Sequence, residues 1–304
     1  MQCRSGNRKN IVHKLMPQPE ISQSHPPVVK KRISDPLSVQ VLLVGLTYLF
    51  FIGFIFLPLG LVFSQAFGKG WSVYLEAIRE PYAIEAVKLT LLTVAIVVPV
   101  NAVFGVAAAW AITKFNFPGK STLKSLLDLP FAVSPVIAGL IFVLLVGSRT
   151  PFGSWLGEHG IKIIFSTPGI IIATIFVTFP FIARELIPLM ESQGRDEEEA
   201  ALTLGAKGWQ IFWTVTLPNI RWGLLYGTIL CGARSIGEFG AVSVVSGHIR
   251  GQTNTVPLHV EILYSEYNFT ASFAVASLLV FLALLTVVIK SGMEKHFQKN
   301  SFHL

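Results

Sequence analysis

Six long apolar runs constrain what this chain can fold into. They cover about residues 37–63, 85–113, 123–147, 168–190, 219–245 and 271–289. A run of about 20 apolar residues matches the hydrocarbon thickness of a bilayer. Hydrophobic residues make up 52% of the chain and charged residues only 13%, roughly half the charged share of an average soluble domain. We therefore expect an all-α membrane protein with six transmembrane helices.

Lysine and arginine are distributed unevenly among the segments that join these runs. Sixteen of them lie in the N-terminal segment, the second–third connection, the fourth–fifth connection and the C-terminal segment, and five lie in the alternate loops. Because short cytoplasmic loops collect these residues, both termini are predicted to be cytoplasmic. The net charge of +7 then reflects membrane topology, so it does not indicate a nucleic-acid-binding surface.

The apolar runs divide the chain into three predicted regions. Residues 1–36 are polar and rich in proline, and we expect them to form a disordered cytoplasmic tail. Residues 37–290 form the predicted transmembrane domain, with a cytoplasmic loop at 191–218, and residues 291–304 form a short cytoplasmic tail. The first apolar run is too long for the core of a signal peptide. Cys3 lies in the tail and Cys231 in a span, a placement that does not suggest a disulfide.

The loop from Glu197 to Pro218 is charged and amphipathic in an otherwise apolar chain. Its acidic start favours a helix N-terminus, and Gly205 permits a tight turn. Trp209 and Trp213 are four residues apart and share a helical face. We expect a short helix, a turn and a second short helix that ends at Leu217-Pro218. Its apolar groups would dock in a partner's groove or rest on lipid headgroups.

The residues of this loop and their spacing resemble those of a known family. Glu199-Ala200-Ala201, followed by Gly205 and by Val215-Thr216-Leu217-Pro218, resembles the cytoplasmic loop signature of binding-protein-dependent ABC import permeases. The resemblance implies the type I ABC importer permease fold and a loop that sits in a cleft of a separate ATPase subunit. The residues that it assigns to ATPase coupling are Glu199, Ala200, Ala201, Gly205, Trp209, Phe212 and Pro218.

Three further segments resemble the sulfate/thiosulfate permeases of this family: FNFPG at 115–119, DLPFAVSPV at 128–136 and RSIGEFGAVS at 234–243. Residues 217–222 and 241–247 are most similar to the second of the two permease subunits in such an importer. The resemblance covers about residues 37–290 and implies sulfate or thiosulfate import across a bacterial inner membrane. The implied partners are two ATPase subunits, a second permease and a periplasmic binding protein. The alternative is a molybdate or tungstate importer, whose permeases share much of the Gly-Glu-Phe-Gly region.

A charged side chain inside a membrane span is energetically costly, so it is a candidate functional residue. Arg234 and Glu238 are four residues apart and share a helical face. They either form an ion pair that fixes helix packing or place Arg234 on the path of a dianion, and both interpretations stay open. Ser134-Pro135 interrupts the third run and either bends that helix or lines the path. The candidate path residues are Ser134, Pro135, Arg234, Ser235 and Glu238.

Other classes of function find little support in the sequence. Gly119-Lys120-Ser121-Thr122 ends like a phosphate-binding loop, but the first glycine of that motif is replaced by Lys114 and an apolar run precedes it. No constellation of Cys, His, Asp and Glu suggests an enzyme or a metal site. A secondary transporter or channel would show inverted repeats and ionisable relays, and it would leave the Glu199 signature unexplained. We expect a transport subunit that binds no cofactor and no metal, with ATP used by a partner chain.

Overall fold

The structure is a computed structural model that describes residues 37–301, with side chains described to Gly292. Residues 37–52 and residues 53–301 belong to two compact units, and each is considered by itself. Every regular element in the described range is helical, which confirms the all-α prediction. The predicted tail at 1–36 lies outside the described residues.

Four helical segments are long and apolar enough to cross a bilayer. The first is Leu37–Phe67, built from α1 (Leu37–Phe51), a π-helical turn (Ile52–Phe56) and α2 (Leu57–Phe67). The others are α4 (Pro81–Lys114), the pair α8 (Thr167–Thr178) and α9 (Pro180–Gln193), and the start of α15 (Phe269–Ser301). These segments match four of the six predicted apolar runs.

The remaining two runs are bent. The third run forms α5 (Lys120–Ala132) and α6 (Pro135–Val146), which meet at 105°. The fifth forms a helix from Gly208 to Ile236 and then α13 (Gly240–Ser246), at 51° to it. Counting each bent pair as one span gives up to six spans in the described part of the chain.

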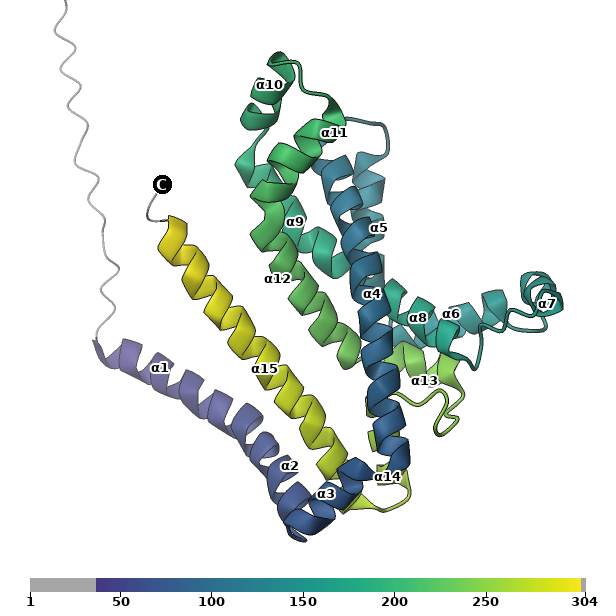
Figure 1. The fold of residues 1–304 in the computed structure, drawn as a ribbon. Coiled ribbons are helices and arrows are strands. Elements are labelled where there is room, and N and C mark those ends of the chain that lie inside the picture. Colours follow the sequence, from purple (N-terminus) through teal and green to yellow (C-terminus); the bar gives the residue numbers. More distant parts are fainter. Residues whose placement is uncertain (1–36, 302–304) are drawn as a thin grey trace, which may run out of the picture. The chain divides into compact units, whose positions relative to one another are not determined.

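Shorter helices join these segments. They are α3 (Trp71–Arg79), α7 (Pro151–Glu158), α10 (Asp196–Thr203) and α14 (Val256–Ser265). The long helix from Gly208 to Ile236 consists of α11 (Gly208–Ile211), the π-helical turn η3 (Phe212–Thr216) and α12 (Leu217–Ile236). Figure 1 shows α10 and α11 at one end of α4 and α14 at the other. These are called the α10 end and the α14 end below.

Small residues let α4, α9 and α12 pack closely. A Cβ added to Gly105 of α4 would lie 2.9 Å from Ile182 Cβ of α9, and one on Gly227 of α12 would lie 3.2 Å from Ile182 Cα. Around this crossing, Ala109, Ile182, Leu186, Met190, Ile220 and Cys231 form one buried cluster. Glycine at helix crossings lets backbones approach in the membrane, where no hydrophobic effect drives helices together.

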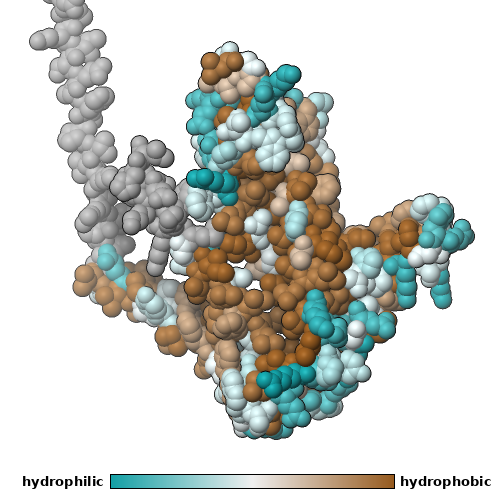
Figure 2. Space-filling view, viewed as in Figure 1, coloured by the Kyte–Doolittle hydropathy of each residue, from teal (hydrophilic) through white to brown (hydrophobic). Residues whose placement is uncertain are grey.

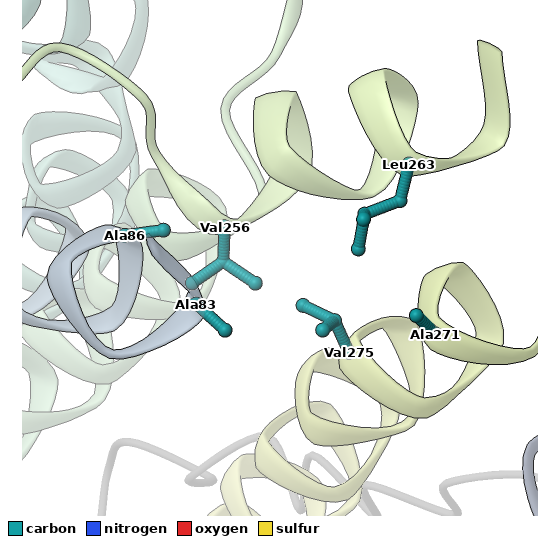
Figure 3. Close-up of a cluster of buried hydrophobic side chains, with 6 residues drawn as sticks. All are labelled: Ala83, Ala86, Val256, Leu263, Ala271 and Val275. Carbon is teal, nitrogen blue, oxygen red and sulfur yellow. The ribbon is translucent and has the colours of Figure 1, made fainter. Parts of the chain in front are cut away.

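A second cluster closes the α14 end. Figure 3 shows Ala83 and Ala86 of α4 turned towards Val256 of α14, with Leu263 of α14 facing Val275 and Ala271 of α15. The N-terminus of α4 is thereby fixed to the segment that connects α13 with α15. Since α4 is 34 residues long, its two ends are about 50 Å apart at 1.5 Å per residue.

The surface is apolar between these two ends. In Figure 2, hydrophobic side chains cover the long helices, and hydrophilic ones gather at the α10 end and at the α14 end. Large apolar side chains such as Val103, Phe104 and Leu144 are about two-thirds exposed. An exposed apolar band of this extent indicates a lipid or protein environment rather than water.

Candidate functional site

The loop between α9 and α12 has the form that its sequence predicts. Four acidic residues occupy the first turn of α10, where the helix dipole favours negative charge. After α10 the chain turns at Gly205, whose φ is +87°, and α11 follows. The predicted helix, turn and second helix are therefore confirmed.

The end of the second helix differs from the prediction. Leu217-Pro218 does not terminate it, because the helix continues from Gly208 to Ile236. The π-helical turn at 212–216 explains this difference. The Leu217 N–H donates to the Phe212 carbonyl five residues back, and Pro218 falls in the first turn of α12, a position at which a helix tolerates proline.

The tip of this loop exposes large apolar side chains. Leu204 is 89% exposed, Trp209 67% and Trp213 51%. The Trp209 and Trp213 rings are 5.4 Å apart, as their spacing predicts. Phe212 is half-buried, with its ring 5.0 Å from that of Trp110 on α4. The tip thus presents an exposed pair of indole rings, and the neighbouring Phe212 packs against the membrane bundle.

The other residues assigned to coupling lie around this tip. Glu199, Ala200 and Gly205 are exposed, Ala201 is half-buried, and Pro218 is exposed within the continuous helix. Glu199 and Ala200 are therefore available to a partner chain. Pro218, by contrast, lies beyond the tip on the helix that leads into the membrane bundle.

Two residues that sequence reasoning missed fix the loop to α4. Lys114, the last residue of α4, has its Nζ 2.5 Å from Glu198 Oε2, and both side chains are largely buried. Lys114 also donates to the Gly194 carbonyl at 2.6 Å, and Thr216 donates to Glu198 Oε1 at 2.8 Å. The only signal in the sequence was a charged residue at the end of an apolar run.

A buried polar cluster lies where α4, α8 and α12 meet. The amide of Asn101 donates to Thr178 Oγ1 at 2.8 Å and lies 3.5 Å from Cys231 Sγ. Ser235, a candidate path residue, is buried and donates to the Cys231 carbonyl at 2.7 Å. Cys231 is a free thiol. Hydrogen bonds between side chains on different helices hold them together in a bilayer, so this cluster fixes the bundle.

Arg234 and Glu238, which share a helical face, form an ion pair. Arg234 Nη1 lies 2.5 Å from Glu238 Oε2, with the Glu238 side chain 1% exposed and the Arg234 side chain 32% exposed. Glu238 Oε1 also accepts from the Ala241 N–H at 2.9 Å, in the first turn of α13. The carboxylate therefore holds the break between α12 and α13, and part of the guanidinium stays open.

The two breaks of the bent spans lie side by side. A Cβ on Gly240, just after the second break, would be 2.9 Å from Pro135 Cβ, just after the first. One on Gly139 would be 2.7 Å from the Ala241 carbonyl oxygen. Ser134 itself is exposed and Pro135 half-buried. The structure thus brings Ser134 and Pro135 to the element that Glu238 caps.

In the described part of the chain, up to six apolar helical spans, a polar loop at one end and two adjoining broken spans define a multi-pass membrane protein. Residues 101–299 match the family described as binding-protein-dependent transport system inner membrane component, and the chain belongs to this family.

Relatives at high identity cover most of the chain. The sulfate transport system permease protein CysW of Escherichia coli K12 is 50% identical over 268 residues, which are 86% of this chain and 92% of that protein. The protein of the same name from Synechocystis is 51% identical over 257 residues, 84% and 93% of the two chains. The E. coli permease CysT is 36% identical over 253 residues, 83% and 91%.

A solved structure has the same fold. A chain in the crystal structure of a bacterial alginate ABC transporter, in complex with a periplasmic protein carrying an alginate pentasaccharide, superposes with a TM-score of 0.72. The match covers 86% of this chain and 96% of that one at 17% identity. The fold of an ABC importer permease is therefore confirmed.

Proposed function

We propose that the chain is a membrane permease subunit of an ATP-driven sulfate importer. The observation that carries this proposal is the 50% identity to the sulfate permease CysW over 92% of that protein's length. Thiosulfate, a second tetrahedral dianion, belongs to the same proposal. The alternative of molybdate or tungstate draws no support from these relatives, whose names specify sulfate.

The importer would contain this chain, a second permease, two ATPase subunits and a periplasmic binding protein, in a bacterial inner membrane. The α10 end faces the cytoplasm in this proposal, because the loops at that end are rich in lysine and arginine. The α14 end then receives the anion from the binding protein. ATP is bound and hydrolysed by the ATPase chains, and this chain holds no cofactor.

The loop of α10 and α11 transmits the motion of the ATPase subunits to this chain. The exposed Trp209–Trp213 pair and the neighbouring Glu199 and Ala200 supply a docking surface for the ATPase. An apolar patch of this kind at the end of a membrane bundle marks a site of protein interaction. When the ATPase subunits close on ATP, the loop moves with them, and α12 and the Lys114–Glu198 pair carry the displacement into the bundle.

The anion path includes the partly open guanidinium of Arg234. A guanidinium attracts a dianion through charge and through paired N–H donors. Glu238 keeps the charge at that position balanced when no anion is present, so the contact is weak enough to release its cargo. Ser134 and Pro135, at the neighbouring break, belong to the same part of the path.

Uptake of radiolabelled sulfate tests this function. Cells that lack their own sulfate importer would carry this chain with its cognate ATPase, second permease and binding protein, and excess molybdate would serve as competitor. ATP-dependent sulfate uptake that resists molybdate is the expected result. Uptake that molybdate abolishes would contradict the proposed substrate.

Glu199→Lys tests the coupling role in the same cells. The charge reversal places a cation on the docking surface and is expected to reduce uptake at least about tenfold. Glu158→Lys is the matched control, because Glu158 is an exposed acid on α7, outside the loop. Full uptake in Glu199→Lys would show that this residue does not take part in coupling.

A further inference from the structure

A second arginine lies exposed on an apolar span. Arg184 belongs to the Thr167–Gln193 span, and its side chain is 55% exposed. Asp128 of α5 lies next to it, with a side chain that is 62% exposed. Charged groups within membrane spans almost always face the bundle interior or a water-filled cavity rather than lipid. This face of the protein is therefore lined by water or by another chain.

The Arg184 guanidinium is held in place, but its hydrogen-bonding capacity is not used up. Its Cζ lies 4.7 Å from the centre of the Phe131 ring, a cation–π contact, and the Phe131 ring lies 5.2 Å from that of Phe181. Arg184 Nε is 3.7 Å from Asp128 Oδ1, too long for a hydrogen bond. Its N–H donors are thus oriented by an aromatic platform and are available to another acceptor.

Arg184 and Arg234 lie next to the two adjoining breaks of the bent spans. Arg184 lies against Phe131 of α5, three residues before Ser134. Arg234 pairs with Glu238, whose carboxylate accepts from the Ala241 N–H, and the adjacent Gly240 approaches Pro135. The two breaks therefore bring both arginines to the same region of the bundle.

The two arginines also differ in depth. Arg234 is next to Ser235, whose hydroxyl lies 3.4 Å from that of Thr178. Arg184 is six residues after Thr178 on the same span, which places it about 9 Å nearer the α10 end. The guanidinium groups thus lie at successive depths along the helix axes, next to the two adjoining breaks.

We propose that Arg184 is a second contact for the tetrahedral oxyanion, on the α10 side of Arg234. This inference rests on the proposed function. The anion passes from Arg234 to the open N–H donors of Arg184, and Phe131 keeps the guanidinium plane in place. Asp128 and the half-buried Glu185 are the acids nearby, and their repulsion prevents the anion from being retained.

Charge rescue of Arg184→Cys tests this proposal in proteoliposomes that hold the whole importer. The substitution is expected to lower sulfate uptake about tenfold, the effect of losing a hydrogen bond to a charged group. Treatment with a methanethiosulfonate that adds an aminoethyl group should restore uptake. The reagents that add a sulfonatoethyl or a methyl group should not restore it. The importer with the unmodified chain is the control for the reagents, because Cys231 is fully buried and any reaction at Cys3 or on the other subunits appears there too.

Arg221→Cys is the matched control variant. Arg221 is an exposed arginine of α12 at the α10 end, and its guanidinium also lies over an aromatic ring, at 5.5 Å from the centre of Trp222. It should keep uptake with or without reagents. ATP hydrolysis stimulated by the binding protein, measured on the same samples, reports assembly of each complex. If Arg184→Cys does not assemble, Arg184→Lys and Arg184→Gln are compared, and the lysine variant should retain several-fold more uptake.

Two results would overturn the proposal. The first is normal sulfate uptake by Arg184→Cys. The second is equal recovery of uptake with the cationic and the methyl reagents, because that result would mean that the Arg184 side chain only fills space. Failure of the proposed function would look different, because the unmodified importer would then hydrolyse ATP without taking up sulfate.

Discussion

Lys114 and Glu198 are 84 positions apart in the chain, yet Lys114 Nζ and Glu198 Oε2 lie 2.5 Å apart with both side chains largely buried. The pair joins the end of α4 to the first turn of α10. Lys124 and Glu191 form a second pair at the same end, at 2.8 Å, but there both side chains are about half exposed. The two pairs therefore allow a matched comparison.

Glu198→Gln removes the charge that compensates a largely buried lysine. We expect the free energy of unfolding to fall by about 2 kcal/mol, the effect of leaving a buried charged group without its partner. Glu191→Gln should change it by less than about 1 kcal/mol, as for exposed pairs. Thermal unfolding of the purified protein in detergent measures both values. Equal effects of the two substitutions would contradict the role of the buried pair.

Gly205 has a positive φ that other residues adopt only with strain. Gly205→Ala is expected to destabilise the turn by about 1–2 kcal/mol and to lower uptake, because α10 and α11 then meet at a different angle. Gly208→Ala is the control, since Gly208 is helical, does not have a positive φ and has open space at its Cβ position. Uptake assays of both variants, with binding-protein-stimulated ATPase rates, separate coupling from folding. A Gly205→Ala variant as active as Gly208→Ala would show that the turn geometry is not required.

Gly139 lies where α6 closely approaches α13. A Cβ there would meet the Ala241 carbonyl oxygen at 2.7 Å and the Ala241 Cα at 3.1 Å. Backbone atoms cannot rotate away, so Gly139→Ala is expected to cost about 1–3 kcal/mol of stability. Gly157→Ala, on α7 with open space around it, should be neutral. The melting temperatures of the two variants in detergent check this, and similar values would refute the close packing of the two broken spans.

His259 of α14 is fully buried, and burial lowers the pKa of its imidazole below the usual value. The Glu80 carboxylate, 3.9 Å away, opposes that shift, and Arg250 adds to it. The unfolded chain therefore binds this proton more readily than the folded protein. Stability should be complete above about pH 6.5 and fall as the pH drops from there towards the lower folded pKa.

The measurement is the melting temperature as a function of pH for the unmodified protein and for His259→Gln. The variant cannot take up the proton, so its loss of stability between about pH 6.5 and 5 should be smaller. His159→Gln, which changes an exposed histidine just after the end of α7, should behave like the unmodified protein. Parallel pH profiles for all three proteins would exclude His259 as the source of the acid sensitivity.

Local signals account for the features that the sequence predicted correctly. A membrane span depends on a continuous apolar run, so the helices around Pro81–Lys114 and Thr167–Gln193 could be located within a few residues. The break at Ser134-Pro135 follows from proline, which cannot continue a helix without losing a hydrogen bond. The acidic first turn of α10 and the turn at Gly205 follow from local rules of the same kind.

Features that depend on distant residues were not predictable in this way. The break after Ile236 is held by the Glu238 side chain and by the approach of Gly240 to Pro135. The fifth run reads in sequence as one uninterrupted span. The helix that continues through Pro218 depends on a π-helical turn, which has no simple sequence signal. The positions of Arg184 beside Asp128 and of Lys114 beside Glu198 required the packing of α4, α5, α9 and α10.

The helix that continues through Pro218 has a mechanical consequence. From Gly208 to Ile236 the backbone is one helical rod of 29 residues, about 43 Å long, with Trp209 at one tip and Arg234 near the other. A rod of this kind transmits rotation as well as displacement. A turn imposed on the indole pair would swing the arginine around the helix axis by a comparable angle, and the break at Gly237 is the first joint at which that torque can be released.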